Sequence, residues 1–185
     1  MASVLVPLAQ GCEELEAVAV IDVLRRAGIE VVTAGLEPAV APVRGRCGVV
    51  LVPDTALDQA LDREFDLVVL PGGLAGTNAL RADPRIRSLI LHQHSQGRLL
   101  AAICAAPVVL AEAGVLAGRR ATSYPGCLAE LGLADILVDE SPVVRDGTVI
   151  TSKGPGTAVE LALCLVEALA GSGERQKVAA EIQRP

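Results

Sequence analysis

Short, uninterrupted runs of apolar residues alternate with longer helical segments along this chain. Such runs are typical of strands in a parallel sheet, because helices cover both faces of the sheet and neither strand face meets water. They predict strands at Ser3–Leu8, Ile29–Ala34, Leu67–Leu70, Leu99–Ile103 and Val149–Thr151. The main predicted helices cover Glu13–Ala27, Pro84–Gln96, Ala105–Ala113 and Ala158–Ala170. This alternation predicts an α/β fold, a doubly wound sandwich built on a mostly parallel sheet with helices on both faces.

Local signals mark a hairpin and two helix starts. Val43–Val52, split at Cys47-Gly48, predicts a small hairpin. Asp83 is the predicted N-cap of a helix whose first residue is a proline. Thr157 and Glu160 have the spacing of a capping box and predict the start of the last helix.

Length and composition favour one domain spanning residues 1–185. No linker, repeat or low-complexity stretch divides the chain, and its 51% apolar content excludes intrinsic disorder. A net charge of −6, with one Phe, one Tyr and no Trp, argues against nucleic-acid and anionic membrane surfaces. Neither a secretory signal nor an apolar stretch of membrane-spanning length is recognised, so we expect a cytoplasmic protein.

The cysteine pattern indicates free thiols in a reducing compartment. The five cysteines are Cys12, Cys47, Cys104, Cys127 and Cys164. They form no C-x-x-C pair, so we expect neither a zinc site nor a thioredoxin-like motif. Cys12 and Cys164 are expected to serve packing, whereas the loop positions of Cys47 and Cys127 leave both a structural and a functional role open.

Candidate functional residues gather where three predicted strands end. In an open parallel sheet, ligands bind beyond the carboxyl ends of the strands. The first strand leads into Gln10–Glu16, the Leu67–Leu70 strand ends in Pro71-Gly72-Gly73, and the Leu99–Ile103 strand ends in Cys104. If the sheet is parallel, these segments meet at one edge.

Cys104 is the candidate nucleophile. It stands between a predicted strand and a helix that starts near Ala105, which is the arrangement of a nucleophile elbow. The partial positive charge of a helix N-terminus predicts a lowered thiol pKa and a reactive thiolate. A buried structural cysteine is the alternative, and the spacing alone favours neither.

Glu16 is the candidate proton carrier. Helical spacing places it on the same apolar stripe as Val20 and Val23, facing the core. Burial raises the pKa of a carboxyl group and makes it a potential proton donor. The alternative is a favourable interaction with the helix dipole, which accounts for Glu13 and Glu14 better than for Glu16.

Two further groups have weaker signals. The Gly72 and Gly73 backbone N–H groups are able to approach a bound oxygen, as an oxyanion hole requires, although Pro-Gly-Gly alone also predicts a simple turn. His92 and His94 stand two residues apart on a predicted helix and face different directions, so we expect no metal bound between them.

Four motifs, in this order along the chain, resemble those of the ThiJ/PfpI superfamily. They are Leu8–Glu16, Val69–Gly73, Ala101–Pro107 and Thr151–Thr157. Because they extend over nearly the whole chain, the likeness is more specific than any single motif. It is closest to the branch of the parkinsonism-associated protein deglycase and its bacterial relatives. The resemblance implies a flavodoxin-like sandwich that forms a homodimer.

The resemblance also implies roles for individual residues. Cys104 matches the family's elbow cysteine, and Glu16 matches a protonated glutamate that is hydrogen-bonded to it. Gly72, Gly73 and Ala105 match the backbone donors near the thiol. The activities of the family include cofactor-free glyoxalase action on methylglyoxal, proposed protein deglycation, chaperone activity and oxidative-stress sensing.

The chain departs from the family pattern at several positions. Ala105 stands where the protease-like branch carries a histidine, and no histidine follows His94 to serve a glutamine amidotransferase, so neither activity is expected. Tyr124 stands where the deglycase has a histidine near the thiol, and we expect it to orient substrate or shield the thiol. Cys47, next to Arg46, replaces an arginine usual on the hairpin.

Two functions are therefore expected at one site. The first is a cofactor-independent cysteine enzyme, glyoxalase- or deglycase-like, that converts small reactive carbonyl compounds such as methylglyoxal to lactate in stress protection. Cys104 would attack the carbonyl, Glu16 would carry protons, and the Gly72, Gly73 and Ala105 amides would hold the oxygen. The alternative is a redox-responsive protective or chaperone-like protein in which Cys104 is oxidised to a sulfinate, with little turnover. In either case we expect no metal.

Overall fold

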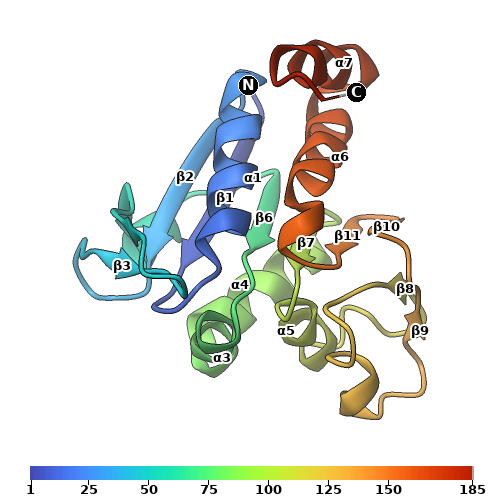
Figure 1. Cartoon of the computed structure of the whole chain (residues 1–185). Coiled ribbons are helices and arrows are strands. Elements are labelled where there is room, and N and C mark those ends of the chain that lie inside the picture. The colour runs from blue at the N-terminus through green and yellow to red at the C-terminus, as the bar shows by residue number, and fades with distance from the viewer. Residues whose placement is uncertain (185) are drawn as a thin grey trace.

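The computed structural model describes residues 1–184 and is built around one seven-stranded sheet (Figure 1). All neighbouring strands of this sheet are parallel except one edge strand, which runs antiparallel to its neighbour. In spatial order the strands are β10 (Val143–Asp146), β11 (Val149–Ser152), β7 (Leu99–Ile103), β6 (Leu67–Leu70), β1 (Ser3–Leu8), β2 (Glu30–Gly35) and β5 (Thr55–Ala56).

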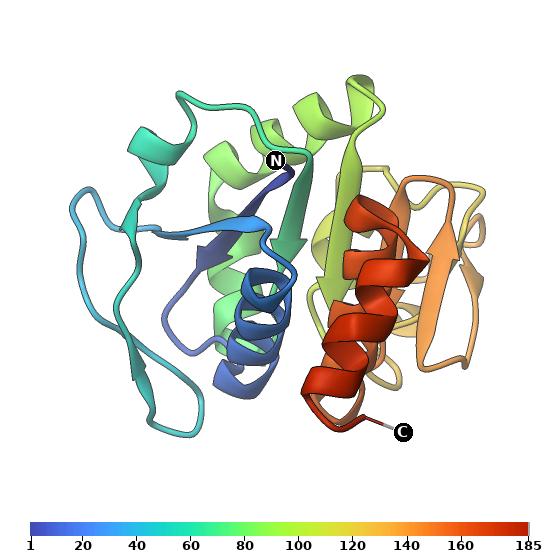
Figure 2. The same ribbon diagram turned by 90° about the horizontal axis from the view of Figure 1, so that it is seen from above.

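Helices cover both faces of this sheet (Figures 1 and 2). Successive strand residues point to opposite faces, so Val4 and Val6 of β1 join one core cluster and Leu5 joins the other. The first face is covered by α1 (Glu14–Arg26), α6 (Ala158–Ala170) and α7 (Ser172–Glu181). The second is covered by α2 (Leu57–Ala60), α3 (Leu74–Ala82), α4 (Pro84–Ser95) and α5 (Pro107–Glu112).

The predicted doubly wound, flavodoxin-like sandwich is confirmed. The five predicted strands form the centre of the sheet in the order second, first, third, fourth, fifth, which is the flavodoxin order. The sequence did not predict α3, α7, the edge strands β5 and β10, or the short pair β8 (Arg120–Ala121) and β9 (Leu137–Val138). Within residues 1–184, no helix has the length and apolar character needed to cross a membrane.

The predicted hairpin is present as β3 (Val43–Arg44) and β4 (Val50–Leu51). The buried Glu14 carboxylate accepts hydrogen bonds from the Cys47 and Val49 N–H groups, at 2.9 and 3.1 Å. Glu13, also buried, pairs with Arg46 at 3.3 Å. The interpretation that Glu13 and Glu14 only interact with the helix dipole is therefore incomplete, because both side chains also bind the hairpin at the start of α1.

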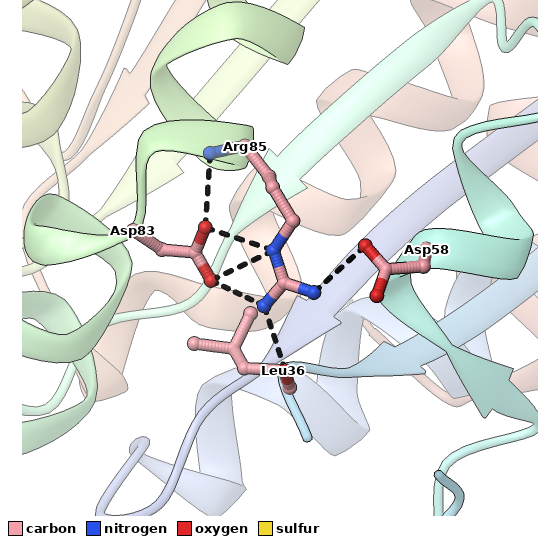
Figure 3. Close-up of polar contacts among 4 residues, drawn as sticks. All are labelled: Leu36, Asp58, Asp83 and Arg85. Carbon is pink, nitrogen blue, oxygen red and sulfur yellow. Dashed lines mark hydrogen bonds and ion pairs between the residues drawn. The ribbon is translucent and has the colours of Figure 1, made fainter. Parts of the chain in front are cut away.

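Asp83 caps α4 as predicted, and its neighbour Arg85 links three elements (Figure 3). The Asp83 carboxylate accepts the Arg85 backbone N–H at 2.9 Å, while the Arg85 guanidinium donates to Asp83, to Asp58 of α2 and to the Leu36 carbonyl after β2. The Arg85 side chain is the main reason that the pKa of Asp83 lies below its usual value. This network fixes α4 against the sheet.

The predicted capping box at the start of α6 is wrong. The Thr157 side chain does not cap that helix. Its hydroxyl accepts the Gly154 N–H at 3.1 Å and lies 2.7 Å from the Ser152 hydroxyl. Thr157 therefore closes the turn that follows β11, because a short 3₁₀ turn at Pro155–Thr157 separates that strand from α6.

Candidate active site

The three segments singled out in the sequence meet at the carboxyl edge of the sheet. Glu16 stands in the first turn of α1, which follows β1, while Gly72 and Gly73 follow β6 and Cys104 follows β7. A Cβ atom placed on Gly72 would lie 2.5 Å from the Cys104 Cβ and 2.6 Å from Glu16 Oε2. The cysteine and the carboxyl group therefore approach the same point of the Gly72 backbone.

Cys104 lies on a sharp turn between β7 and the start of α5. Its φ is +64°, a left-handed conformation that is strained for a residue with a side chain. The surrounding backbone holds it there: its N–H donates to the Ser152 carbonyl at 2.9 Å, and its carbonyl accepts the Tyr124 N–H at 2.7 Å. This is the elbow arrangement that the sequence predicted, with the side chain almost fully buried.

The Glu16 carboxyl is completely buried beside this thiol. Its Oε2 accepts the Gly72 N–H at 2.8 Å, whereas Oε1 has no hydrogen-bond partner within residues 1–184. Burial raises the pKa of Glu16 to about 7, although the Gly72 N–H acts in the opposite direction. The predicted upward shift is confirmed, and near neutral pH the group is able both to accept and to donate a proton.

The predicted lowering of the Cys104 pKa is wrong. Burial raises the pKa of this thiol to about 12, and the charge of an ionised Glu16 adds to the effect. The N–H groups of Gly73 and Ala105 oppose the shift without overcoming it. Attack by sulfur therefore requires that a neighbouring base take the thiol proton, and Glu16 is placed to do so.

The backbone donors have two different roles. The Gly73 and Ala105 N–H groups are directed at the Cys104 sulfur, so they lie close to any oxygen on a carbon bound to that sulfur. The Gly72 N–H is already taken by Glu16 Oε2. The expectation that Gly72 also binds substrate oxygen is therefore corrected: Gly72 positions the carboxyl group.

We expect Gly72→Ala to destabilise the fold by about 1–3 kcal/mol, because the added methyl group overlaps Cys104, Glu16 and the Ile103 carbonyl, the last at 2.8 Å. Chemical denaturation measures the change. Gly156→Ala is the matched control, since nothing lies within 4 Å of the methyl group it adds. Equal stability of the two variants would contradict the close packing around Gly72.

Cys104 opens onto a cavity of about 830 Å³. Its lining includes the predicted residues Ala105 and Tyr124 together with Cys127, Arg44 and Arg46. The sequence alone does not decide between a structural and a functional role for Cys127, and it does not predict that either arginine lines the site. No periodic pattern identifies the arginines, because they reach the cavity only through docking of the hairpin.

The remaining candidate residues lie elsewhere. Cys12 is packed in the core, where burial raises its pKa to about 11, and the partly buried Cys164 packs against the same core. His92 and His94 stand on α4, where His92 lies 3.8 Å from Glu64, and neither lines the Cys104 cavity.

One group of side chains has the composition of a metal site. Ligand atoms of Glu13, Glu14 and Cys47 lie within 4.8 Å of one another. Glu14 already accepts two backbone N–H groups, and Glu13 pairs with Arg46. Because both carboxylates have partners that a cation would have to displace, we assign no metal to this group.

Comparison with known proteins identifies the family. The DJ-1/PfpI family matches residues 2–168. Protein dj-1beta of Drosophila melanogaster is 50% identical over 177 residues, which cover 96% of this chain and 94% of the relative. The crystal structure of Drosophila melanogaster DJ-1beta, 46% identical, superposes with a TM-score of 0.95 and covers 100% of this chain and 98% of that chain.

A second relative has a name that states an activity. Glutathione-independent glyoxalase DJR-1.2 of Caenorhabditis elegans is 40% identical over 164 residues, covering 88% of this chain and 85% of the relative. The family match covers most of the chain, and the Drosophila relative is 50% identical to it. The observed strand order is consistent with that match. The chain belongs to the DJ-1/PfpI family.

Proposed function

We propose that this chain is a cofactor-independent enzyme that converts small reactive carbonyl compounds to hydroxy acids, with methylglyoxal to lactate as the test reaction. The observation that carries the proposal is the buried Cys104–Glu16 pair, whose cysteine lines an open cavity. The name of the nematode relative, a glutathione-independent glyoxalase, supports the same chemistry.

The first step forms a carbon–sulfur bond. Ionised Glu16 takes the thiol proton while the Cys104 sulfur attacks the aldehyde carbon, and the carbonyl electron pair moves to oxygen. The Gly73 and Ala105 N–H groups stabilise the negative charge that develops there. Glu16 then returns the proton to this oxygen and leaves a thiohemiacetal on Cys104.

The second step moves hydrogen between the two carbons. Glu16 removes the proton from the carbon bound to sulfur, and the electron pair moves toward the adjacent carbonyl to form an enediolate, with the negative charge on that carbonyl's oxygen. Glu16 returns this proton to that second carbon, and the hydroxyl proton on the first carbon moves to the oxygen of the second, which gives a thioester of lactate. Water then cleaves the carbon–sulfur bond and releases lactate and the free thiol, so that one water is consumed for each methylglyoxal. A Glu16 pKa of about 7 suits a group that must gain and lose a proton in each cycle.

The direct test is lactate formation by the purified protein from methylglyoxal, without glutathione or any other additive. Lactate should equal the methylglyoxal consumed over many turnovers, and Cys104→Ala should produce none above background. Loss of methylglyoxal without lactate, at one equivalent per chain or less, would indicate covalent trapping and exclude the proposed reaction.

We expect Tyr124→Phe to lower kcat/KM less than tenfold, because it removes at most one neutral hydrogen bond of about 0.5–1.5 kcal/mol. Tyr124 lines the cavity with half of its side chain exposed, and its hydroxyl makes no hydrogen bond within residues 1–184. Its established contact with Cys104 is through the backbone N–H, which the variant keeps. A thousandfold loss in kcat/KM would show that the phenol takes part in proton transfer.

The unpartnered oxygen of Glu16 favours a second candidate function, redox sensing. A protonated Oε1 beside Cys104 is placed to donate to an oxygen added to the sulfur. Two hydroperoxides would oxidise the thiol to a sulfinic acid and leave as two alcohols or waters. Peptide mass spectrometry after peroxide treatment should then find two added oxygens on Cys104 before any other cysteine. Earlier oxidation of Cys47 or Cys127 would contradict this role.

We also propose that two copies of the chain associate through an apolar surface formed by α1 and the hairpin. Leu15 and Val18 of α1 are exposed, as are Val49, Val50 and Val52 of the hairpin region. Val18 and Val52 line the same groove, so the two sets are neighbours. Exposed apolar side chains in one patch are typical of protein interfaces.

Light scattering at micromolar concentration should therefore give twice the 19.0 kDa chain mass. Val18→Asp should shift the protein to monomer, because it places a charge in the apolar patch. Leu137→Asp is the control, since Leu137 is also an exposed apolar residue but lies on β9. A monomeric wild-type protein would contradict the proposed association.

A further inference from the structure

The walls of the Cys104 cavity carry one sign of charge. Arg44 and Arg46 of the hairpin region line the cavity, and no Asp or Glu is among its lining residues within the described chain. This local sign is opposite to the net charge of −6 of the whole protein. A cleft lined by one sign of charge concentrates small ligands of the opposite sign.

The two arginines differ in their partners. Arg46 Nη1 lies 3.3 Å from the buried Glu13 carboxylate, which neutralises its charge. Arg44 has no carboxylate within 4 Å in residues 1–184, and its guanidinium makes only one long contact, at 3.4 Å, to the Gly48 carbonyl. Arg44 therefore supplies one unpaired positive charge to the cavity wall.

The backbone of Arg44 is hydrogen-bonded to the segment that connects β1 to α1. Its N–H donates to Gln10 Oε1 at 2.9 Å, and its carbonyl accepts the Gly11 N–H at 2.8 Å. Gln10 in turn donates to the Pro42 carbonyl at 2.9 Å. Gln10 and Gly11 directly precede the segment that leads into α1, so these hydrogen bonds join the Arg44 backbone to the part of the chain that carries Glu16.

We propose that Arg44 binds the carboxylate of an anionic carbonyl substrate, so that the cavity selects oxo acids over neutral aldehydes. An arginine presents paired N–H donors that match the two oxygens of a carboxylate. The single unpaired charge on the wall matches a monoanion. The inference rests on the proposed function, in which the Cys104 sulfur attacks the carbonyl carbon while Arg44 holds the other end of the molecule.

The test compares two alkylating reagents of nearly equal size, one an anion and the other neutral. Iodoacetate carries a carboxylate next to the carbon that sulfur attacks, whereas iodoacetamide is neutral. Both form a carbon–sulfur bond at Cys104 and release iodide. Peptide-resolved mass spectrometry gives the two rates at Cys104 separately from those at Cys127, and their ratio measures the preference of the cavity for the anion.

Arg44→Gln should lower the iodoacetate to iodoacetamide ratio at Cys104 by roughly fivefold or more, and added salt should lower it in the wild-type protein. Arg87→Gln is the matched control, because Arg87 is an exposed arginine of α4 outside the cavity and the same charge is removed. An unchanged ratio in Arg44→Gln, or an equal fall in both variants, would overturn the inference.

Glyoxylate, a small oxo acid, tests in the same assay whether the cavity binds a carbonyl compound that carries a carboxylate. It should protect Cys104 of the wild-type protein from iodoacetamide, and this protection should be lost in Arg44→Gln. Equal protection of both proteins would exclude Arg44 as the carboxylate-binding residue. Alkylation needs the Cys104 thiol, a base for its proton and the cavity, but none of the steps after sulfur attack, so these outcomes are independent of lactate formation. An anion preference without lactate formation would uphold the cavity's selectivity and reject the proposed reaction.

Discussion

Cys104→Ala is expected to lower kcat/KM for methylglyoxal by about a thousandfold or more, because it removes the nucleophile of the reaction. Cys104 is the thiol that lies beside Glu16 and receives the Gly73 and Ala105 N–H groups. Cys127→Ala is the matched control, since Cys127 lines the same cavity. We expect kcat/KM of this control to stay within about threefold of the wild type. A comparable loss in both variants would show that the reaction uses two thiols.

The strained backbone of Cys104 makes a second comparison possible. Its φ of +64° is easily adopted by glycine but strained for alanine, so Cys104→Gly should be more stable than Cys104→Ala by about 1 kcal/mol. Both variants should be inactive. Urea denaturation of the two proteins measures the difference. A Gly variant less stable than the Ala variant would mean that the elbow is not strained and that packing decides its stability.

Most of the sheet could be predicted because its strands are buried on both faces. The run Leu99–Ile103, for example, has the same bounds in the sequence prediction and in the structure. The helix α3 has no comparable signal. It begins directly after Gly73 and contains Gly76, a poor helix former. A Cβ on Gly76 would lie 2.7 Å from the Cys12 Cα, so close packing against another segment requires glycine there. Local propensity does not reveal such a tertiary requirement.

The candidate site was predictable to the extent that topology determines it. Cys104, Gly73 and Glu16 follow from strand ends that must meet and from a carboxyl group on an apolar stripe. The direction in which the Cys104 pKa shifts was not predictable from the sequence. Burial and the nearby Glu16 charge raise this pKa, and together they outweigh the backbone N–H groups that lower it. Arg44 was not foreseen either, because its place depends on how Glu14 docks the hairpin.

The fully buried carboxyl of Glu16 should also make the stability of the protein depend on pH. Its pKa is raised from 4.5 to about 7 on folding, so the protonated form stabilises the fold. This stabilisation is fully present when the pH is below the pKa of Glu16 in the unfolded chain, and it is lost as the pH rises through the pKa of Glu16 in the folded protein. The shift corresponds to about 3 kcal/mol in total, of which about 2 kcal/mol falls between about pH 5.5 and pH 8.

Glu16→Gln should remove this dependence, because the amide keeps an acceptor for the Gly72 N–H and has no charge to bury. We expect the variant to be more stable than the wild type at about pH 8, with a difference of about 2 kcal/mol that shrinks toward about pH 5.5. Its kcat/KM should nevertheless fall by about a hundredfold or more, since glutamine cannot take the thiol proton.

Asp22→Asn is the control for both measurements, because Asp22 is an exposed carboxyl on the same helix. It should leave the pH dependence of unfolding and the activity unchanged. If Glu16→Gln keeps the wild-type pH profile, the buried carboxyl is not the titrating group. If it keeps full activity as well, the proton carrier must be sought elsewhere in the cavity. Opposite changes in stability and activity in one variant would show that the fold tolerates the buried charge because the chemistry requires it.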